Sequence, residues 1–125
     1  MPKFTILIAE DSKSMQVFYQ KSLPDAFFDK HIVSDGKEAL VSYEALKPDI
    51  ILLDMNMPEL NGYQTLKTIR ETFKDLQTTI IMVTSASEKE DVIACAKLGI
   101  QGYIVKPFKQ EELPQLVMKC HRGKK

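Results

Sequence analysis

Short apolar runs and amphipathic stretches alternate along the whole chain. The apolar runs cover residues 4–9, 31–33, 50–53, 80–83 and 103–105, and the second of them is the weakest. They are rich in β-branched residues, and three of them are apolar at consecutive positions. Continuous apolarity over a short run is typical of a strand with both faces buried in a parallel sheet. The pattern therefore predicts five strands.

Each apolar run is followed by a stretch in which apolar side chains recur every three or four residues, as on one face of an α-helix. The clearest stripe runs over residues 63–73, and the others lie at 15–23, 39–46, 92–96 and 113–120. Pro24 and Pro48 end the first two patterns, and Gly99 suits a left-handed cap after the fourth. Residues 85–88 and 87–90 both fit a capping box at the start of the fourth helix.

The strict alternation of strands and helices predicts the fold class. Five βα units in a row favour a parallel sheet with right-handed crossovers, and hence a three-layer, doubly wound (βα)5 protein of the α/β class. Five units are too few for an eight-stranded barrel.

Length and composition fit one domain of this kind. The chain has 125 residues, of which 44% are hydrophobic and 27% charged, far from the composition of a disordered protein. We expect a domain over residues 1–122 and a basic tail over residues 123–125.

Charge and cysteine content limit the cell compartments and the classes of binding partner that fit this sequence. Seventeen basic residues balance seventeen acidic ones, so no global charge points to nucleic acid or to an anionic membrane. No apolar run approaches the roughly 20 residues of a membrane helix, and the first strand begins too early to leave room for a signal peptide. Cys95 and Cys120 have no CxxC spacing and are expected as reduced thiols. These features predict a cytoplasmic protein.

Polar residues follow four of the five apolar runs. Glu10 and Asp11 follow the first, Asp54 the third, Thr84 the fourth and Lys106 the fifth. In an open parallel sheet, ligands bind beyond the carboxyl ends of the strands, where the strand order reverses. Three carboxylates, a hydroxyl and an ammonium group are therefore expected at one edge of the sheet.

This set of side chains suits phosphoryl chemistry with a divalent cation. Neighbouring carboxylates repel one another, and a cation removes that repulsion. Oxygen ligands without thiolate or imidazole favour a hard ion such as Mg²⁺. A lysine and a threonine can bind phosphoryl oxygens, and one carboxylate could attack phosphorus to form an aspartyl-phosphate.

With these residues in this order, the whole sequence resembles the receiver domain of response regulators and is similar to single-domain chemotaxis regulators. Asp54 and Thr84 are 30 residues apart and Thr84 and Lys106 are 22 apart, as in that family. The resemblance implies a flavodoxin-like sheet with strand order 2-1-3-4-5. It also implies a phosphoacceptor switch in a two-component system rather than an enzyme, with a sensor histidine kinase or a histidine phosphotransfer protein as donor.

The resemblance further implies a role for each metal-site residue. Asp54 would be the phosphoacceptor, and Asp11 and Asp54 would ligate Mg²⁺ directly. The backbone carbonyl of Asn56 would complete the protein ligands. Glu10 stands where many members carry Asp, and it would act through a bound water.

The remaining roles concern the phosphoryl group and the switch. Thr84 and Lys106 would each contact a phosphoryl oxygen, and the bond before Pro107 would be cis. Tyr103 would be the switch aromatic, turning inward as Thr84 moves and changing the face formed by the fourth helix and fifth strand.

Several readings of single residues stay open. Tyr103 could equally be a buried strand tyrosine with a satisfied hydroxyl. Glu10 and Asp11 could act only as helix caps, and Thr84 could cap the fourth helix as well as bind phosphoryl. Ala86, two residues after Thr84, carries no polar group. Since the family uses that position and Asn56 to flank the hydrolytic water, we hypothesise a long-lived phosphorylated state.

Two other functions compete with the receiver interpretation. A Mg²⁺-dependent phosphohydrolase would also use an aspartyl nucleophile, but the position two residues after Asp54 is Asn56, which cannot serve as its general acid. A degenerate receiver would act as an unphosphorylated binding module. The main prediction is a stand-alone receiver, unless the chain is a fragment, whose output is binding to a downstream protein rather than to nucleic acid or a membrane.

Overall fold

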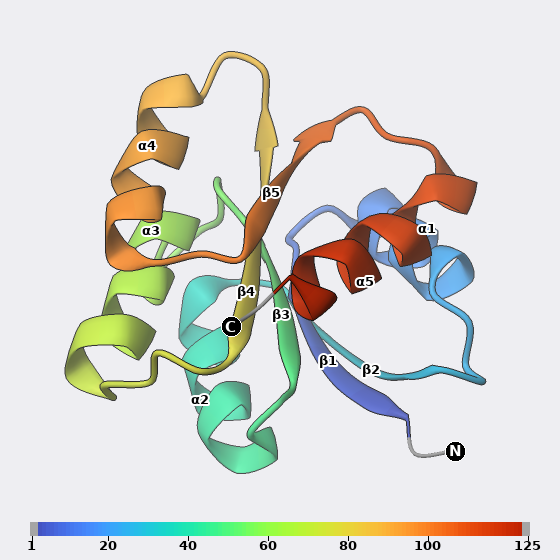
Figure 1. The fold of residues 1–125 in the computed structure, drawn as a ribbon, viewed down its shortest axis with the longest axis horizontal. Coiled ribbons are helices and arrows are strands. Elements are labelled where there is room, and N and C mark those ends of the chain that lie inside the picture. The colour runs from blue at the N-terminus through green and yellow to red at the C-terminus, as the bar shows by residue number, and fades with distance from the viewer. Residues whose placement is uncertain (1–2, 124–125) are drawn as a thin grey trace.

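Five parallel strands form one sheet at the centre of the protein (Figure 1). The computed structural model describes residues 3–123. The strands are β1 (Phe4–Ala9), β2 (Phe28–Val33), β3 (Ile50–Asp54), β4 (Thr79–Ser85) and β5 (Gly102–Lys106). Their order is β2-β1-β3-β4-β5, and all neighbours are parallel. The predicted fold class and strand order are confirmed.

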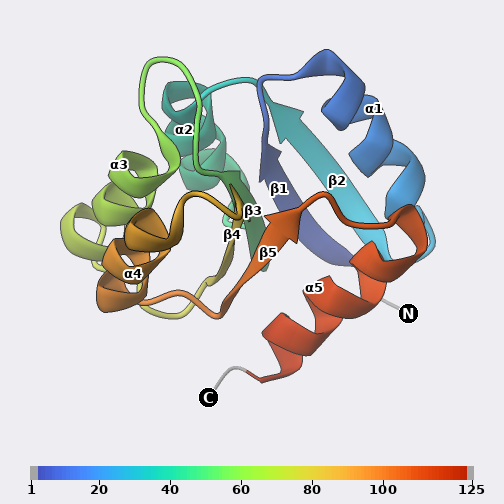
Figure 2. The same cartoon turned by 90° about the horizontal axis from the view of Figure 1, so that it is seen from above.

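Helices cover both faces of this sheet. They are α1 (Lys13–Ser22), α2 (Gly36–Leu46), α3 (Gly62–Lys67), α4 (Lys89–Leu98) and α5 (Leu113–Arg122), with a π-helical turn, η1 (Thr68–Thr72), and a 3₁₀ turn, η2 (Gln110–Glu112). Figure 2 shows α1 and α5 on one face and α2, α3 and α4 on the other.

Side chains of the central strands alternate between two separate hydrophobic clusters. Ile6 and Ile8 of β1 pack in a cluster with residues of α1 and α5, whereas Leu7 and Ala9 pack in a cluster with residues of α2, α3 and α4. All four side chains are buried. Burial on both faces explains why this strand appears in the sequence as an unbroken apolar run.

The second strand is longer than its sequence pattern predicts. It begins at Phe28, not at residue 31, and pairs with β1 from Phe4↔Phe28 to Ala9↔Val33. As an edge strand it leaves Asp29 exposed and Lys30 and His31 partly exposed. Polar residues are tolerated in an edge strand, so the apolar run alone predicted a strand shorter than β2 is.

The third helix also departs from its expected form. The stripe over residues 63–73 predicts one regular helix, but α3 ends at Lys67 and continues as the π-helical turn η1. There the N–H of Phe73 donates to the carbonyl of Thr68, five residues earlier. Ile69 and Arg70 are both buried in this turn.

The start of the fourth helix corrects another expectation. The helix begins at Lys89, with Glu88 as the preceding residue and no side-chain cap. The N–H of Ser85 does donate to the carboxylate of Glu88, but the Ser85 hydroxyl also donates to it instead of accepting from the backbone. Neither predicted capping box forms in full.

The two cysteines are free, with Cys95 buried and Cys120 partly buried. Within residues 3–123, no helix is long and apolar enough to cross a membrane. Most of the predicted basic tail, Lys124 and Lys125, lies outside the described residues.

Candidate functional site

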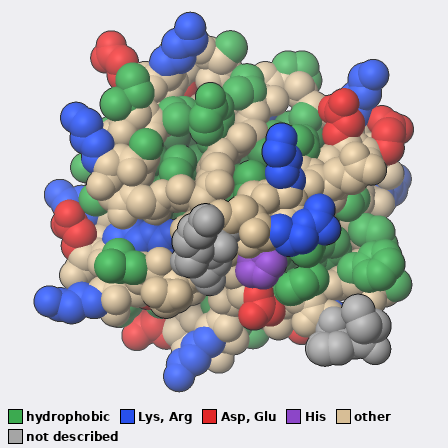
Figure 3. Space-filling view, viewed as in Figure 1, with side chains coloured by type: hydrophobic (Ala, Val, Ile, Leu, Met, Phe, Trp, Pro, Cys, Tyr) green, Lys and Arg blue, Asp and Glu red, His purple; other side chains and the backbone are tan. Residues whose placement is uncertain are grey.

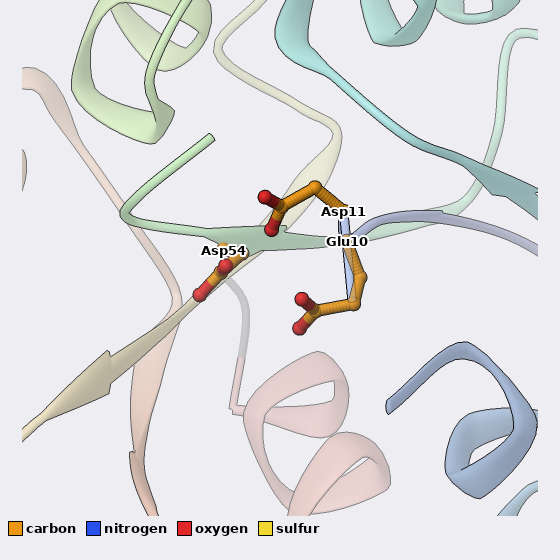
Figure 4. A group of neighbouring side chains, drawn as sticks. All are labelled: Glu10, Asp11 and Asp54. Atoms are coloured by element: carbon orange, nitrogen blue, oxygen red, sulfur yellow. The ribbon is translucent and has the colours of Figure 1, made fainter. Parts of the chain in front are cut away.

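Three carboxylates meet at the carboxyl ends of β1 and β3. Ala9 and Leu53 are register partners in these neighbouring strands, so the residues that follow them emerge side by side. Oxygen atoms of Glu10, Asp11 and Asp54 all lie within 4.8 Å of one another (Figure 4). Glu10 and Asp54 are buried, and Asp11 is exposed.

Lys106 brings a positive charge to this cluster from the end of β5. Its Nζ lies 3.0 Å from Asp54 Oδ1 and 3.5 Å from Glu10 Oε1. The Lys106–Pro107 peptide bond is cis. One ammonium group therefore contacts two of the three carboxylates.

The buried position of Asp54 makes its ionisation costly. Desolvation is the largest cause, and together with the negative charges of Glu10 and Asp11 it outweighs the hydrogen bond and the positive charge of Lys106, so the pKa of Asp54 is raised to about 6. Within the described residues, Glu10 Oε1 is buried and accepts no hydrogen bond. The cluster thus holds more negative charge than its single lysine neutralises.

Glu10 is held in place by hydrogen bonds from the N-cap and the first turns of α1. Glu10 Oε2 accepts a hydrogen bond from the N–H of Ser12 at 3.0 Å, and the Glu10 carbonyl accepts one from the Gln16 side chain at 2.6 Å. These contacts keep the other carboxylate oxygen of Glu10 turned toward Lys106.

Thr84 and Asn56 lie at the same end of the sheet, and both side chains bind Glu88. Thr84 Oγ1 donates to Glu88 Oε1 at 2.9 Å, and Asn56 Nδ2 donates to Glu88 Oε2. Desolvation pushes the pKa of Glu88 upward, but hydrogen bonds from Ser85, Thr84 and Asn56 outweigh it and hold that pKa below its ordinary value.

Sequence reasoning missed this role of Glu88, which it considered only as part of a capping box. The available signal was its spacing. Glu88 follows Thr84 by four residues across a turn before a helix, which can bring its carboxylate back to the strand end.

The remaining predicted residues lie nearby. Tyr103 on β5 is 54% exposed, which rules out the alternative of a buried strand tyrosine. Ala86 is exposed in the loop between β4 and α4. Both line a groove of about 370 Å³ that also includes Thr84, Val92 and Ile93.

The donor set fits a hard divalent cation. Its protein groups are carboxylate oxygens, one of which, the buried Glu10 Oε1, accepts no hydrogen bond and has only its ion pair with Lys106, and the cluster carries excess negative charge. Beside it stand an ammonium and a hydroxyl group that suit phosphoryl oxygens. The fold and this arrangement define a doubly wound α/β protein with an acidic cluster at the carboxyl edge of its sheet.

Comparison with known proteins assigns this class to a family. The response regulator receiver domain family matches residues 6–118, and the chain belongs to that family, the receiver domain of two-component response regulators.

Curated relatives include full-length regulators. The alkaline phosphatase synthesis transcriptional regulatory protein PhoP of Bacillus subtilis is 35% identical over 108 residues, which is 86% of this chain and 44% of that protein. The DNA-binding response regulator MtrA of Mycobacterium tuberculosis is 33% identical over 86% of this chain and 46% of its own length. The chain spans about half the length of these relatives.

Solved structures agree on the fold. The chemotaxis response regulator CheY4 of Vibrio cholerae has a TM-score of 0.87 and 28% identity, covering 95% of this chain and 99% of that one. The receiver domain of sensor histidine kinase PA1611 from Pseudomonas aeruginosa, which has a magnesium ion in its active-site cleft, has a TM-score of 0.82 and 29% identity, covering 97% and 99% of the two chains.

Proposed function

We propose that this protein is a phosphoacceptor switch in which Asp54 receives a phosphoryl group from a phosphohistidine of a sensor histidine kinase or a histidine phosphotransfer protein. The observation that carries the proposal is the meeting of Asp54 with Glu10, Asp11 and Lys106 at one strand edge. We assign the receiver to residues 1–122, around the family match at 6–118.

Asp54 is suited to attack phosphorus because it is ionised at neutral pH and oriented by Lys106. Its pKa of about 6 leaves the carboxylate charged at pH 7 and above. In the transfer, a bond forms between a carboxylate oxygen of Asp54 and phosphorus, and the bond from phosphorus to the donor imidazole nitrogen breaks. Lys106 then pairs with a phosphoryl oxygen, as an ammonium group does in other phosphate sites.

Asp11, Asp54 and the backbone carbonyl of Asn56 would hold Mg²⁺, with Glu10 acting through a water. When bound, the ion neutralises charge on the phosphoryl oxygens. The proximity of the three carboxylates and the buried Glu10 oxygen that accepts no hydrogen bond support this site. The magnesium ion in the PA1611 receiver domain supports it by similarity.

The output face is the groove between α4 and β5. Its lining includes Thr84 at the phosphoryl end and the exposed side chains of Ile93 and Tyr103 farther away. Figure 3 shows hydrophobic side chains gathered beside α4 and β5. Movement of Thr84 toward a phosphoryl oxygen, with Tyr103 turning inward, would reshape this groove and change its affinity for a downstream protein.

The test is phosphorylation by a small donor. We expect incubation with Mg²⁺ and acetyl phosphate to add one phosphoryl group to the intact mass of the wild-type chain. Asp54→Asn and removal of Mg²⁺ with EDTA should each abolish the gain. A folded wild-type chain that binds Mg²⁺ but gains no mass would overturn the proposal and favour an unphosphorylated binding module, and catalytic release of phosphate from other esters would favour a phosphohydrolase.

A further inference from the structure

The Glu88 carboxylate connects the loop after β3 to the end of β4, and both belong to the proposed phosphoacceptor site. Asn56 lies in the loop after β3, Thr84 is the second-last residue of β4, and Glu88 precedes α4. One oxygen of Glu88 accepts from Thr84, and the other accepts from Asn56. The N–H and the hydroxyl of Ser85 also donate to Oε1, at 2.7 and 3.1 Å.

These contacts engage the hydroxyl that phosphoryl recognition needs. A threonine hydroxyl has a single hydrogen to donate. While Thr84 gives that hydrogen to Glu88, it cannot give it to a phosphoryl oxygen on Asp54. Binding of Thr84 to Glu88 and binding of Thr84 to a phosphoryl group therefore exclude each other.

The contact also lies next to the groove beside α4. Thr84, Ser85 and Lys89 line the groove beside α4, and Glu88 lies between them in the chain. A hydrogen bond to a charged acceptor is stronger than one between neutral groups, so the ionised Glu88 gives the resting arrangement a real energetic preference.

We propose that Glu88 is a positioning residue that holds Thr84 and Asn56 in the resting arrangement, so that phosphorylation of Asp54 must first displace Thr84 from the Glu88 carboxylate. This inference rests on the proposed function. It adds that the extent of phosphorylation at a given donor concentration is set partly by a side chain that does not touch the phosphoryl group. A ligand shifts an equilibrium only through its different affinity for the two states, and Glu88 stabilises one of them.

The proposal predicts that weakening the acceptor favours the phosphorylated form. In Glu88→Gln the carbonyl oxygen can still accept from Thr84 and Ser85, but as a weaker, uncharged acceptor, and the amide nitrogen cannot accept from Asn56; Glu88→Ala removes the acceptor of Thr84 altogether. We expect the acetyl phosphate concentration that gives half phosphorylation to fall roughly fivefold to tenfold in Glu88→Gln, and at least as far in Glu88→Ala.

A matched control and a second background separate this role from a simple charge effect. Glu90 is an exposed acidic residue in the first turn of the same helix, and Glu90→Gln should leave the half-phosphorylation concentration unchanged. In a Thr84→Val background the hydroxyl is gone, so Glu88→Gln should gain less than about twofold if it acts through Thr84.

An NMR measurement can detect the hydrogen bond between Asn56 and Glu88 in the unphosphorylated protein. The side-chain amide protons of Asn56 should move upfield in the NMR spectrum of Glu88→Gln and stay in place in Glu90→Gln, because the bond to a carboxylate is lost only in the first. Melting temperature by circular dichroism confirms that the variants remain folded.

The outcomes separate the two proposals. If the wild type is phosphorylated but Glu88→Gln and Glu88→Ala behave as the wild type does, the role of Glu88 is refuted and the switch function stands. A full gain from Glu88→Gln in the Thr84→Val background also refutes it and assigns the effect to charge. If no variant is phosphorylated, both the switch function and the role of Glu88 are refuted.

Discussion

Asp54 combines burial with a shortage of positive charge. It lies within 4.8 Å of two other acidic side chains and has one ammonium partner. Relative to the unfolded chain, the folded protein therefore favours the protonated form of Asp54, whose pKa is raised to about 6. The chain gives up stability at this residue, which is common where a reactive group must be kept ready.

Replacing Asp54 by Asn should stabilise the protein when no divalent cation is present. The pKa of Asp54 is raised in the folded state, so its favourable contribution is complete at low pH and is lost as the pH rises through about 6. Relative to wild type, Asp54→Asn in EDTA should gain on the order of 5 °C in melting temperature at pH 8 and little at pH 4.

Circular dichroism melts between pH 4 and 8 check this expectation. Asp91→Asn, which removes an exposed acidic residue of α4, is the control and should show no gain that grows with pH. A gain for Asp54→Asn that is equal at every pH would contradict the titration of Asp54 as its cause.

Some site residues could be predicted from the sequence because their positions follow from the fold. Glu10, Asp54, Thr84 and Lys106 each lie within one residue of the end of a strand, and parallel strands bring their carboxyl ends to one edge. The hydrogen bond between Glu88 and Thr84 could not be predicted from the sequence, since it depends on the path of the turn before α4. The exposure of Tyr103 depends on β5 being an edge strand, which the apolar run itself does not reveal.

The start of α3 is fixed by how closely it approaches β3. A Cβ at Gly62 would lie 2.4 Å from the carbonyl oxygen of Asp54 and 2.9 Å from the Cα of Met55. Backbone atoms cannot move aside as a flexible side chain would. The absence of a side chain at Gly62 therefore lets the helix rest directly against the strand end that carries Asp54.

Gly62→Ala should reverse the usual effect of such a change. Alanine normally stabilises a helix by up to about 1 kcal/mol relative to glycine. Here overpacking should lower the free energy of unfolding by about 1–3 kcal/mol and slow the phosphorylation of Asp54. Urea denaturation and the rate of mass gain with acetyl phosphate measure the two effects.

Gly123→Ala is the matched control for this variant. A Cβ at Gly123 would lie 3.3 Å from its nearest neighbour, Lys119 O, and this tight contact can relax because Gly123 is exposed at the end of α5, so only a small loss of stability is expected. Stability of Gly62→Ala equal to or above that of wild type would show that α3 can move away from β3 without cost.

The turn η1 is held by a buried guanidinium group. Arg70 is 4% exposed, and its side chain donates to the carbonyls of Gly99, Asp75 and Thr78 and to the side chain of Gln101. Its contacts join η1 to the loop before β4, which holds Asp75 and Thr78, and to the loop between α4 and β5, which holds Gly99 and Gln101. The stripe of apolar residues predicted a helix here, but the π-helical turn depends on this polar network, whose partners are distant in sequence.

Arg70→Met should destabilise the protein by about 3 kcal/mol. The substitution keeps much of the apolar stem but leaves several buried carbonyl groups without a donor. Urea denaturation gives the loss directly. Arg122→Met changes an exposed arginine at the end of α5 and should cost less than about 0.5 kcal/mol. Equal effects of the two changes would be inconsistent with the network as a support of the fold.

The protein as a whole should be stabilised by Mg²⁺. An ion that binds the folded state alone adds stability that grows with its concentration, about 2.7 kcal/mol at 100 times the dissociation constant. The melting temperature should therefore rise with added MgCl₂ and return with EDTA. Asp11→Asn should lose most of this rise because it removes one of the three clustered carboxylates.

NaCl at matched ionic strength is the control for this measurement. NaCl should leave the wild-type melting temperature nearly unchanged, because it screens charges in general but supplies no divalent cation to the acidic cluster. An equal rise with both salts would argue against a site for the cation in this cluster.

The two hydrophobic clusters on opposite faces of the sheet give the molecule a property useful to its evolution. Since α1 and α5 pack in one cluster and α2, α3 and α4 in the other, side-chain changes on one face reach the other only through the strands between them. Free-energy effects of substitutions in different clusters should then add, whereas those within one cluster should depend on each other. Substitutions in the cluster around α1 and α5 can accordingly accumulate without disturbing the packing that supports the α4 surface, so the two sides of the molecule can evolve separately.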